Sequence, residues 1–255
     1  MKPIIIDVDS QNIEKYPATC FMNPNDQGYK TKKEWLLKRF SEGLKIKLLY
    51  VENDKKCHGF IEYVPGEYAW RAVKAKGYLF IHCIWVSPNI FKKKGNGSLL
   101  VQAVIEDAKK QGKYGVAVVT SEGSFMAGKD LFIKNGFQSV AKAQPSFELL
   151  MKPLKKGPLP EFNNWEKQLN SLKGLNIVYS NQCPWVARFI REVGGKKKDL
   201  NITEQKTAKD AQNAPSPYSV FNLVYNGKML ADHYISMTRF QNILKKEVGI
   251  FRRGT

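Results

Sequence analysis

The stretch YLFIHCIWVSPNIFKKKGNGSLLVQAVIEDAKKQG, from Tyr78 to Gly112, decides the fold of this chain. Its first residues are aromatic and β-branched and predict a strand over Tyr78 to Val86, which Ser87-Pro88 ends because proline has no amide hydrogen to donate. Beyond the glycines, apolar residues recur at helical spacing until Gly112, a natural helix stop. The stretch therefore predicts a strand, a glycine-rich turn and a helix.

The turn Gly95-Asn96-Gly97 has the chemistry of a phosphate-binding site. Glycine lets backbone N–H groups approach a ligand closely, and a helix N-terminus adds unpaired donors and the positive end of the helix dipole. Lys92, Lys93 and Lys94 place three positive charges directly before the turn. A Gly-x-Gly taken alone also fits a tight strand-to-helix turn beside a solvated lysine run.

Two motifs resemble the GCN5-related N-acetyltransferase (GNAT) family. Val86-Ser87-Pro88 and the run from Lys92 to Gly97 resemble motif A, V-x-P followed by Arg or Gln-x-x-Gly-x-Gly or Ala, with Lys92 in place of the usual Arg or Gln. Residues 129–137, KDLFIKNGF, resemble motif B, L-Y-x-x-x-G-F. The resemblance implies an α/β fold with a mixed sheet, the GNAT acyl-CoA N-acyltransferase fold.

The resemblance also implies a reaction, in which an amine attacks the thioester of acetyl-coenzyme A directly. It assigns the pantetheine arm to the strand backbone around residues 84–86 and the pyrophosphate to the amides of the glycine turn. The residues implied to bind the co-substrate are Ile84, Trp85, Val86, Lys92, Lys93, Lys94, Gly95, Asn96, Gly97, Ser98 and Phe132.

His82 is the candidate catalytic base, because it lies four residues before Val86, where the family places a Glu or His facing the substrate cleft. An unshifted histidine pKa of about 6.5 suits a base at neutral pH. The other interpretation is a semi-buried histidine paired within the sheet. Phe132 replaces the tyrosine of motif B and cannot donate a proton, so the leaving thiolate is left to water or to another group such as Ser124.

The remaining elements of the first domain follow the order of that fold. Strands are expected at 4–8, 44–51, 57–64, 114–120, 137–142 and 146–151. A helix is expected to begin at Thr31, as N-cap, with Glu34 completing a capping box, and to stop at Gly43.

Prolines and glycine concentrate in residues 154–162, which predicts a linker between a first domain over 1–153 and a second over 163–255. In the second domain a strand, a Cys-Pro pair and a helix resemble the active-site corner of the thioredoxin fold, and the C-terminal segment resembles the YoaP-type domain behind some bacterial acetyltransferases. The resemblance implies a smaller thioredoxin-like α/β domain.

Cys183 precedes the predicted helix of that second domain. A thiol at a helix N-terminus has a lowered pKa and suits a redox role. Val186 stands where a second thiol would complete a C-x-x-C pair, which favours a structural or partner-docking role. Both interpretations stay open.

Composition limits the other partners. The chain has 255 residues and a net charge of +18, but its lysines are dispersed in short groups and no arginine cluster or aromatic platform accompanies them. Nucleic acid is therefore not the expected partner. No apolar run approaches about 18 residues, and the N-terminus has no signal peptide pattern. Four widely spaced cysteines indicate neither a metal site nor a disulfide framework, which favours the cytoplasm.

Two functions are compatible with these patterns. The first is an acetyl-CoA-dependent N-acetyltransferase whose amine acceptor the sequence does not name. The alternative is an acyl-CoA-binding sensor or adaptor with weakened catalysis, whose C-terminal domain docks a protein partner.

Overall fold

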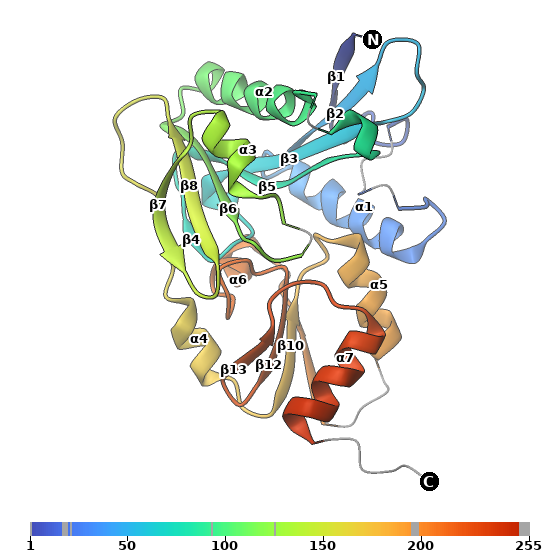
Figure 1. Cartoon of the computed structure of the whole chain (residues 1–255), viewed down its shortest axis with the longest axis vertical. Coiled ribbons are helices and arrows are strands. Elements are labelled where there is room, and N and C mark those ends of the chain that lie inside the picture. The colour runs from blue at the N-terminus through green and yellow to red at the C-terminus, as the bar shows by residue number, and fades with distance from the viewer. Residues whose placement is uncertain are drawn as a thin grey trace.

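A computed structural model describes residues 2–16, 20, 22–92, 94–124, 126–194 and 199–249. Within them, a large sheet and a small sheet lie at opposite ends of the molecule (Figure 1). The large sheet has seven strands in the order β1 (Pro3–Val8), β2 (Lys45–Val51), β3 (Gly59–Pro65), β5 (Tyr78–Val86), β6 (Gly115–Thr120), β8 (Phe147–Pro153) and β7 (Gln138–Ala143). Only β5 and β6 run parallel, so the sheet is mixed as expected.

Helices cover both faces of the large sheet. The first face carries α2 (Asn96–Lys110) and α3 (Lys129–Lys134), whose Leu100, Val104 and Phe132 are fully buried in one apolar core. A second core on the other face contains Trp35 and Leu36 of α1 (Gln27–Phe40). The predicted strand, turn and helix over 78–112 are therefore confirmed as β5, the glycine turn and α2.

The start of α1 differs from the sequence-based expectation. The helix begins at Gln27, four residues before the predicted N-cap Thr31, because the Asp26 carboxylate accepts a 2.7 Å hydrogen bond from the backbone N–H of Gly28. The predicted capping box at Thr31 is therefore wrong, since Thr31 lies within the helix.

The small sheet has four strands in the order β11 (Leu200–Glu204), β10 (Leu175–Tyr179), β12 (Phe221–Tyr225) and β13 (Lys228–Ala231). β10 and β11 run parallel and the remaining pairs run antiparallel. The helices of this part are α4 (Trp165–Ser171), α5 (Pro184–Val193), α6 (Ala208–Gln212) and α7 (Met237–Ile243), and a π-helical turn (Leu244–Val248) follows α7. This strand order is the one that a thioredoxin-like fold requires. The assignment of this part of the chain as thioredoxin-like stays a prediction.

The predicted linker forms a two-stranded sheet with β4 (Val73–Lys74) and is hydrogen-bonded to the large sheet at Tyr78. Its β9 (Glu161–Phe162) pairs with β4, and the Tyr78 hydroxyl donates a 2.9 Å hydrogen bond to the carbonyl of Pro158. The division into domains at 154–162 stays a prediction, and these contacts tie the segment to the large-sheet side. No helix among the described residues is long and apolar enough to cross a membrane.

The two sheets are held together by close helix contacts. In Figure 1, α1 and α5 lie side by side, and their residues are in contact. A Cβ at Gly28 would lie 2.3 Å from the carbonyl oxygen of Pro184, so only glycine permits this approach. Ala208 and Ala211 of α6 belong to the core beneath the large sheet. The helices α1, α5 and α6 therefore lie around the space between the two sheets.

Candidate active site

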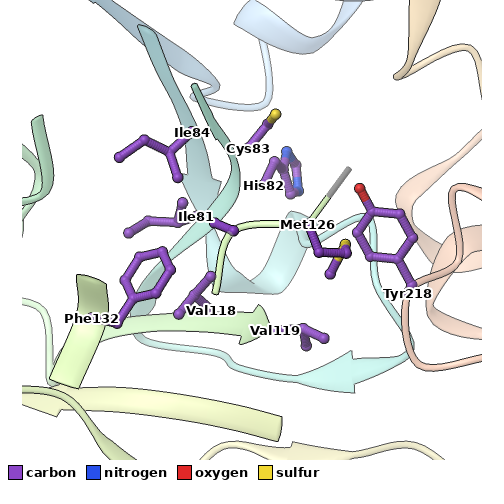
Figure 2. A pocket seen from close by; sticks show the side chains of 10 residues that line it. Ile81, His82, Cys83, Ile84, Val118, Val119, Met126, Phe132 and Tyr218 are labelled. Atoms are coloured by element: carbon purple, nitrogen blue, oxygen red, sulfur yellow. The ribbon is translucent and has the colours of Figure 1, made fainter. Parts of the chain in front are cut away.

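A wedge opens between β5 and β6. Their paired residues run from Tyr78↔Gly115 to Ile81↔Val118, whereas β5 continues to Val86. Beyond Ile81 the two strands diverge around a small pocket, which has Val118 and Val119 on one side (Figure 2). On the side of β6, the backbone of β5 from His82 onward therefore faces a space, while its other edge stays paired with β3.

A β-bulge sits at the mouth of this wedge. Glu62 pairs with Cys83 and Tyr63 pairs with Ile81, so His82 is an extra residue on β5. In Figure 2 the Ile81 and Ile84 side chains point to one side of β5, and His82 and Cys83 point to the other. A bulge of this kind redirects side chains and is common beside active sites.

The N-terminus of α2 keeps its backbone donors open. Gly95 takes the left-handed conformation as N-cap, at φ 84°, and no side chain caps the helix. The side chains of the turn bind protein groups instead, since the Asn96 amide donates to the carbonyl of Phe91 at 2.9 Å and the Ser98 hydroxyl accepts from Asn135 at 3.0 Å. The first N–H groups of a helix have no intrahelical acceptor, so this turn suits an anion.

The other residues implied to bind the co-substrate surround the same end of α2. Lys92 is exposed and its ammonium lies 5.3 Å from the centre of the Trp85 ring, while Lys94 is exposed to solvent. Lys93 lies outside the described residues. Ile84 packs in the core under α2, and Val86 packs against that core.

Phe132 and Gly97 both pack against neighbouring side chains, and their binding of the co-substrate stays a prediction. Phe132 of α3 is fully buried at the wedge. Its ring centre lies 5.4 Å from that of Phe137, with the two rings packed edge to face. Gly97 faces α3, because a Cβ there would lie 3.2 Å from Cδ1 of Leu131. Gly95 therefore provides the unusual turn, while Gly97 permits close packing of two helices.

A cavity of about 340 Å³ lies between the two sheets. His82, Cys83 and Tyr218 line both this cavity and the wedge, so the two spaces meet. The large-sheet side contributes Cys20, Lys32, Phe60, Glu62, Arg71, His82, Cys83, Trp85, Ser87 and Ser124. The small-sheet side contributes Gln182, Cys183, Trp185, Val186, Tyr218, Val220, His233 and Tyr234.

A buried chain of polar side chains crosses from one sheet to the other. The Lys32 ammonium lies 2.5 Å from Oε2 of Glu62, and Oε1 of Glu62 accepts a 2.9 Å hydrogen bond from Gln182. Gln182 in turn accepts a 2.6 Å hydrogen bond from Arg71. Burial raises the pKa of Glu62, but Lys32 and His82 outweigh burial and bring it to about 2. Glu62 is therefore ionised at neutral pH.

His82 does not have the free imidazole that the sequence-based expectation required. Its Nε2 accepts a 3.0 Å hydrogen bond from the backbone N–H of Trp70, so the proton of the neutral ring sits on Nδ1. Nδ1 lies 3.3 Å from Oε1 of Glu62, without hydrogen-bond geometry. Burial lowers the pKa of His82 to about 4, with Arg71 and Lys32 adding to that effect and Glu62 opposing it.

This environment corrects the reasoning that made His82 the base. A group with a pKa of about 4 holds almost no proton at neutral pH, and the only lone pair of its ring is already used by Trp70. His82 lines the wedge and the cavity, and its role in catalysis stays a prediction, without the unshifted pKa on which that role was argued.

Cys183 lies where the sequence predicts it, as the N-cap of α5 and on the cavity wall. Burial raises the pKa of its thiol and outweighs the backbone N–H groups of Val186 and Trp185, which lower it. The expected lowering of this pKa is therefore wrong. All four cysteines are free, and the described residues contain no cluster of histidine, cysteine and acidic side chains that could hold a metal ion.

Several residues of this cavity were not expected from the sequence. Glu62 and Arg71 interrupt apolar runs, GFIEYVP and AWRAV, and a charge within a buried run is the one local signal they give. Gln182 and Tyr218 give no such signal. Ser124, the expected alternative proton donor, lines the cavity and is exposed.

Comparison with known proteins agrees with the two resemblances. Residues 11–137 match the acetyltransferase (GNAT) family and residues 199–242 match the YoaP-like family. The uncharacterised N-acetyltransferase YoaP of Bacillus subtilis (strain 168) is 27% identical over 251 residues, which cover 94% of this chain and 97% of that protein.

Similar solved structures include acetyltransferases of several bacteria and an archaeon. PaiA N-acetyltransferase from Thermoplasma acidophilum, in complex with coenzyme A, is 16% identical and covers 60% of this chain and 99% of its own, with a TM-score of 0.42. IAA acetyltransferase from Bacillus cereus ATCC 14579 is 15% identical, covers 60% and 100%, and has the same TM-score of 0.42. Residues 11–137 of the chain therefore belong to the GNAT family of acetyltransferases, and a YoaP-like segment lies near its C-terminal end.

Proposed function

We propose that this protein transfers the acetyl group of acetyl-coenzyme A to an amine bound in the cavity between the two sheets. One observation carries the proposal: the wedge and the cavity share His82, Cys83 and Tyr218, so a thioester held in the wedge faces an acceptor held in the cavity. Because both reactants are held in one site, the attack of the amine on the thioester becomes effectively intramolecular.

The donor side suits the parts of acetyl-coenzyme A. The open N–H groups and positive dipole end of α2 bind the pyrophosphate, with Lys92 and Lys94 exposed beside them. The pantetheine arm extends along the β5 backbone at Ile84, Trp85 and Val86, where β6 has diverged. The N–H groups of the same stretch are the candidate donors to the oxyanion.

The charged and polar residues of the cavity, Glu62 and His82 among them, determine which protonation state of the acceptor amine is favoured there. Two buried cations, Lys32 and Arg71, disfavour a protonated amine in the cavity, so the acceptor binds as the neutral amine that can attack. As the C–N bond forms, the nitrogen becomes acidic and its proton passes to water, because Glu62 with a pKa of about 2 is too weak a base to hold it. Lys32 and Gln182 hold the Glu62 carboxylate, and His82 is a neutral neighbour whose Nδ1 lies 3.3 Å from it.

The pKa values of His82 and Glu62 determine how kcat/KM is expected to depend on pH. Because the pKa of His82 is about 4 and that of Glu62 about 2, neither group changes its protonation state near neutral pH. We expect a profile of kcat/KM between pH 6 and 9 to follow the pKa of the acceptor amine, as tested with two amines of different basicity. An inflection near about 6.5 that is the same for both amines would restore His82 as the base.

Tyr218 is the proton donor that replaces the hydroxyl missing from Phe132. It lines the wedge and the cavity, and Figure 2 shows its hydroxyl turned toward Met126 and His82. Burial raises the pKa of Tyr218, so the phenol keeps its proton until the thiolate leaves. The Arg71 guanidinium lies 4.4 Å from the ring centre and favours the phenolate that remains.

The test is a calorimetric titration with acetyl-coenzyme A, followed by a thiol-release assay against a panel of amines. Binding together with amine-dependent release of coenzyme A supports the proposal. Binding without release with any amine would point to the acyl-CoA sensor instead, an alternative that no comparison favours. Absence of binding would remove the assignment of the wedge and the glycine turn.

A further inference from the structure

The cavity carries an unbalanced positive charge. Among the described residues that line the cavity, Lys32 and Arg71 are the cations and Glu62 is the carboxylate. Glu62 pairs with Lys32 at 2.5 Å, while the partners of Arg71 among the described residues are two backbone carbonyls, the amide oxygen of Gln182 and the Tyr218 ring. A buried cation without an anionic partner is unfavourable, so a ligand that brings a negative charge is favoured here.

Arg71 still has donors to offer. Nη1 donates to the Trp70 carbonyl and to Gln182, and Nη2 donates to the His82 carbonyl, each at 2.6 Å. A guanidinium has five N–H groups, so two of them, including that on Nε, have no acceptor among the described residues. Arg71 is only 2% exposed, and it lines the cavity. A planar group with paired oxygens, such as a carboxylate, matches such donors.

The spacing between the charged groups also points to a particular ligand. The side-chain amide of Gln182 donates to Glu62 at 2.9 Å and accepts from Arg71 at 2.6 Å. One small polar group therefore spans the distance from the carboxylate to the guanidinium. An amino-acid head group has the same pattern, because its nitrogen carries hydrogen and its neighbouring carboxylate accepts hydrogen bonds.

Resting on the proposed function, we propose that the acceptor is an amino acid or a similar small amino-carboxylate, with its carboxylate bound by Arg71 and its amine directed to Glu62. The rest of the cavity favours an apolar side chain, because Phe60, Trp185 and Val220 form its wall. The volume of about 340 Å³ accommodates a molecule of this size.

Cys83 is the competing source of negative charge. Its pKa is lowered, first by a hydrogen bond from Cys20 and further by Lys32 and Arg71. If its thiolate balanced Arg71, the cavity would need no anionic ligand. The experiment therefore includes Cys83→Ser, which removes the thiol while Arg71 stays in place.

The experiment compares L-phenylalanine with L-phenylalaninol, which has a hydroxymethyl group in place of the carboxylate. We expect kcat/KM for phenylalanine to be at least about tenfold higher, as a charge-assisted bond allows. Arg71→Met should abolish that preference and Arg71→Lys should keep part of it, with acetyl-coenzyme A affinity unchanged in both. Equal rates for the two acceptors in the wild-type protein would overturn the inference while leaving N-acetyl transfer intact.

A binding measurement covers the case in which the Arg71 variants do not fold or the enzyme does not turn over. Calorimetry of wild-type protein with 3-phenylpropionate and with 3-phenylpropanol compares a carboxylate with an alcohol of the same shape. Tighter binding of the carboxylate by about tenfold or more supports the inference even without turnover. Equal binding, or a preference that appears only in Cys83→Ser, overturns it.

Discussion

Two helices begin at the site, and their N-termini are built in opposite ways. At α2, Gly95 turns the backbone through a left-handed conformation, and a Cβ there would meet nothing within 4 Å. At α5, Pro184 follows Cys183 and its carbonyl is pressed against Gly28 of α1. The first N-terminus is open to a ligand, whereas the second is closed by protein.

The difference shows that a helix N-terminus becomes a ligand site only when its surroundings leave the backbone accessible. Both ends have the positive end of a helix dipole and unpaired N–H groups, although Pro184 at the start of α5 has no N–H of its own. At α5 these groups face a half-buried thiol whose pKa is raised by loss of solvent in spite of them. The donor side of the site therefore depends on open backbone, and the acceptor side depends on side chains and on close packing of the two sheets.

Tyr218→Phe gives the largest expected effect, because it removes a reacting group from the acceptor side without changing its packing. We expect kcat to fall by roughly a hundredfold, the usual loss of a general acid, with acetyl-coenzyme A affinity unchanged. Single-turnover kinetics measure the chemical step directly. The control is Tyr234→Phe, which alters the cavity wall away from the wedge. Equal single-turnover rates in both variants would contradict the role of Tyr218 as proton donor. The acceptor side would then contribute binding only.

Gly28→Ala breaks the closed N-terminus at α5. The new Cβ would lie 2.3 Å from the Pro184 carbonyl, so α1 and α5 must separate. Overpacking of this kind costs about 1–3 kcal/mol of unfolding free energy, and the KM of the acceptor should rise with it. Urea denaturation and steady-state kinetics measure the two effects. Gly128→Ala is the control, since nothing lies within 4 Å of a Cβ there.

Gly97→Val disturbs the open N-terminus at α2. Its side chain would press on Leu131, 3.2 Å from the new Cβ, and shift the turn that binds the pyrophosphate. Calorimetry should show acetyl-coenzyme A binding weakened by roughly tenfold, with the acceptor KM unchanged. The exposed Lys94→Ala should weaken binding less and in a salt-dependent manner. Wild-type affinity in Gly97→Val would show that the co-substrate does not use this turn.

The donor side was predictable because its signals are local. The strand, the glycines and the helix lie within residues 78–112, and each follows from spacing and from residue types that end or start elements. Sequence alone did not separate the two glycines: Gly95 has the positive φ, while Gly97 is needed for contact with α3.

The acceptor side was not predictable because it depends on contacts between distant segments. Arg71 and Gln182 are 111 positions apart, and Glu62 and Gln182 are 120 positions apart. No local period relates residues at such separations. The bulge that turns His82 and Cys83 to one face depends on the register between β3 and β5, and the shift in the pKa of His82 follows from the burial that results.

Cys183→Ala gives the smallest expected effect and tests the closed N-terminus at α5 most directly. Because burial raises the pKa of this thiol, it stays protonated near neutral pH and is a poor nucleophile. We expect turnover within about twofold of wild type, a change typical of a site that takes no part in the reaction. In the native protein, iodoacetamide should modify Cys183 more slowly at pH 8 than in urea, as followed by mass spectrometry. Faster labelling in the native state would mean that the helix dipole overcomes burial, and α5 would then be an active N-terminus like that of α2.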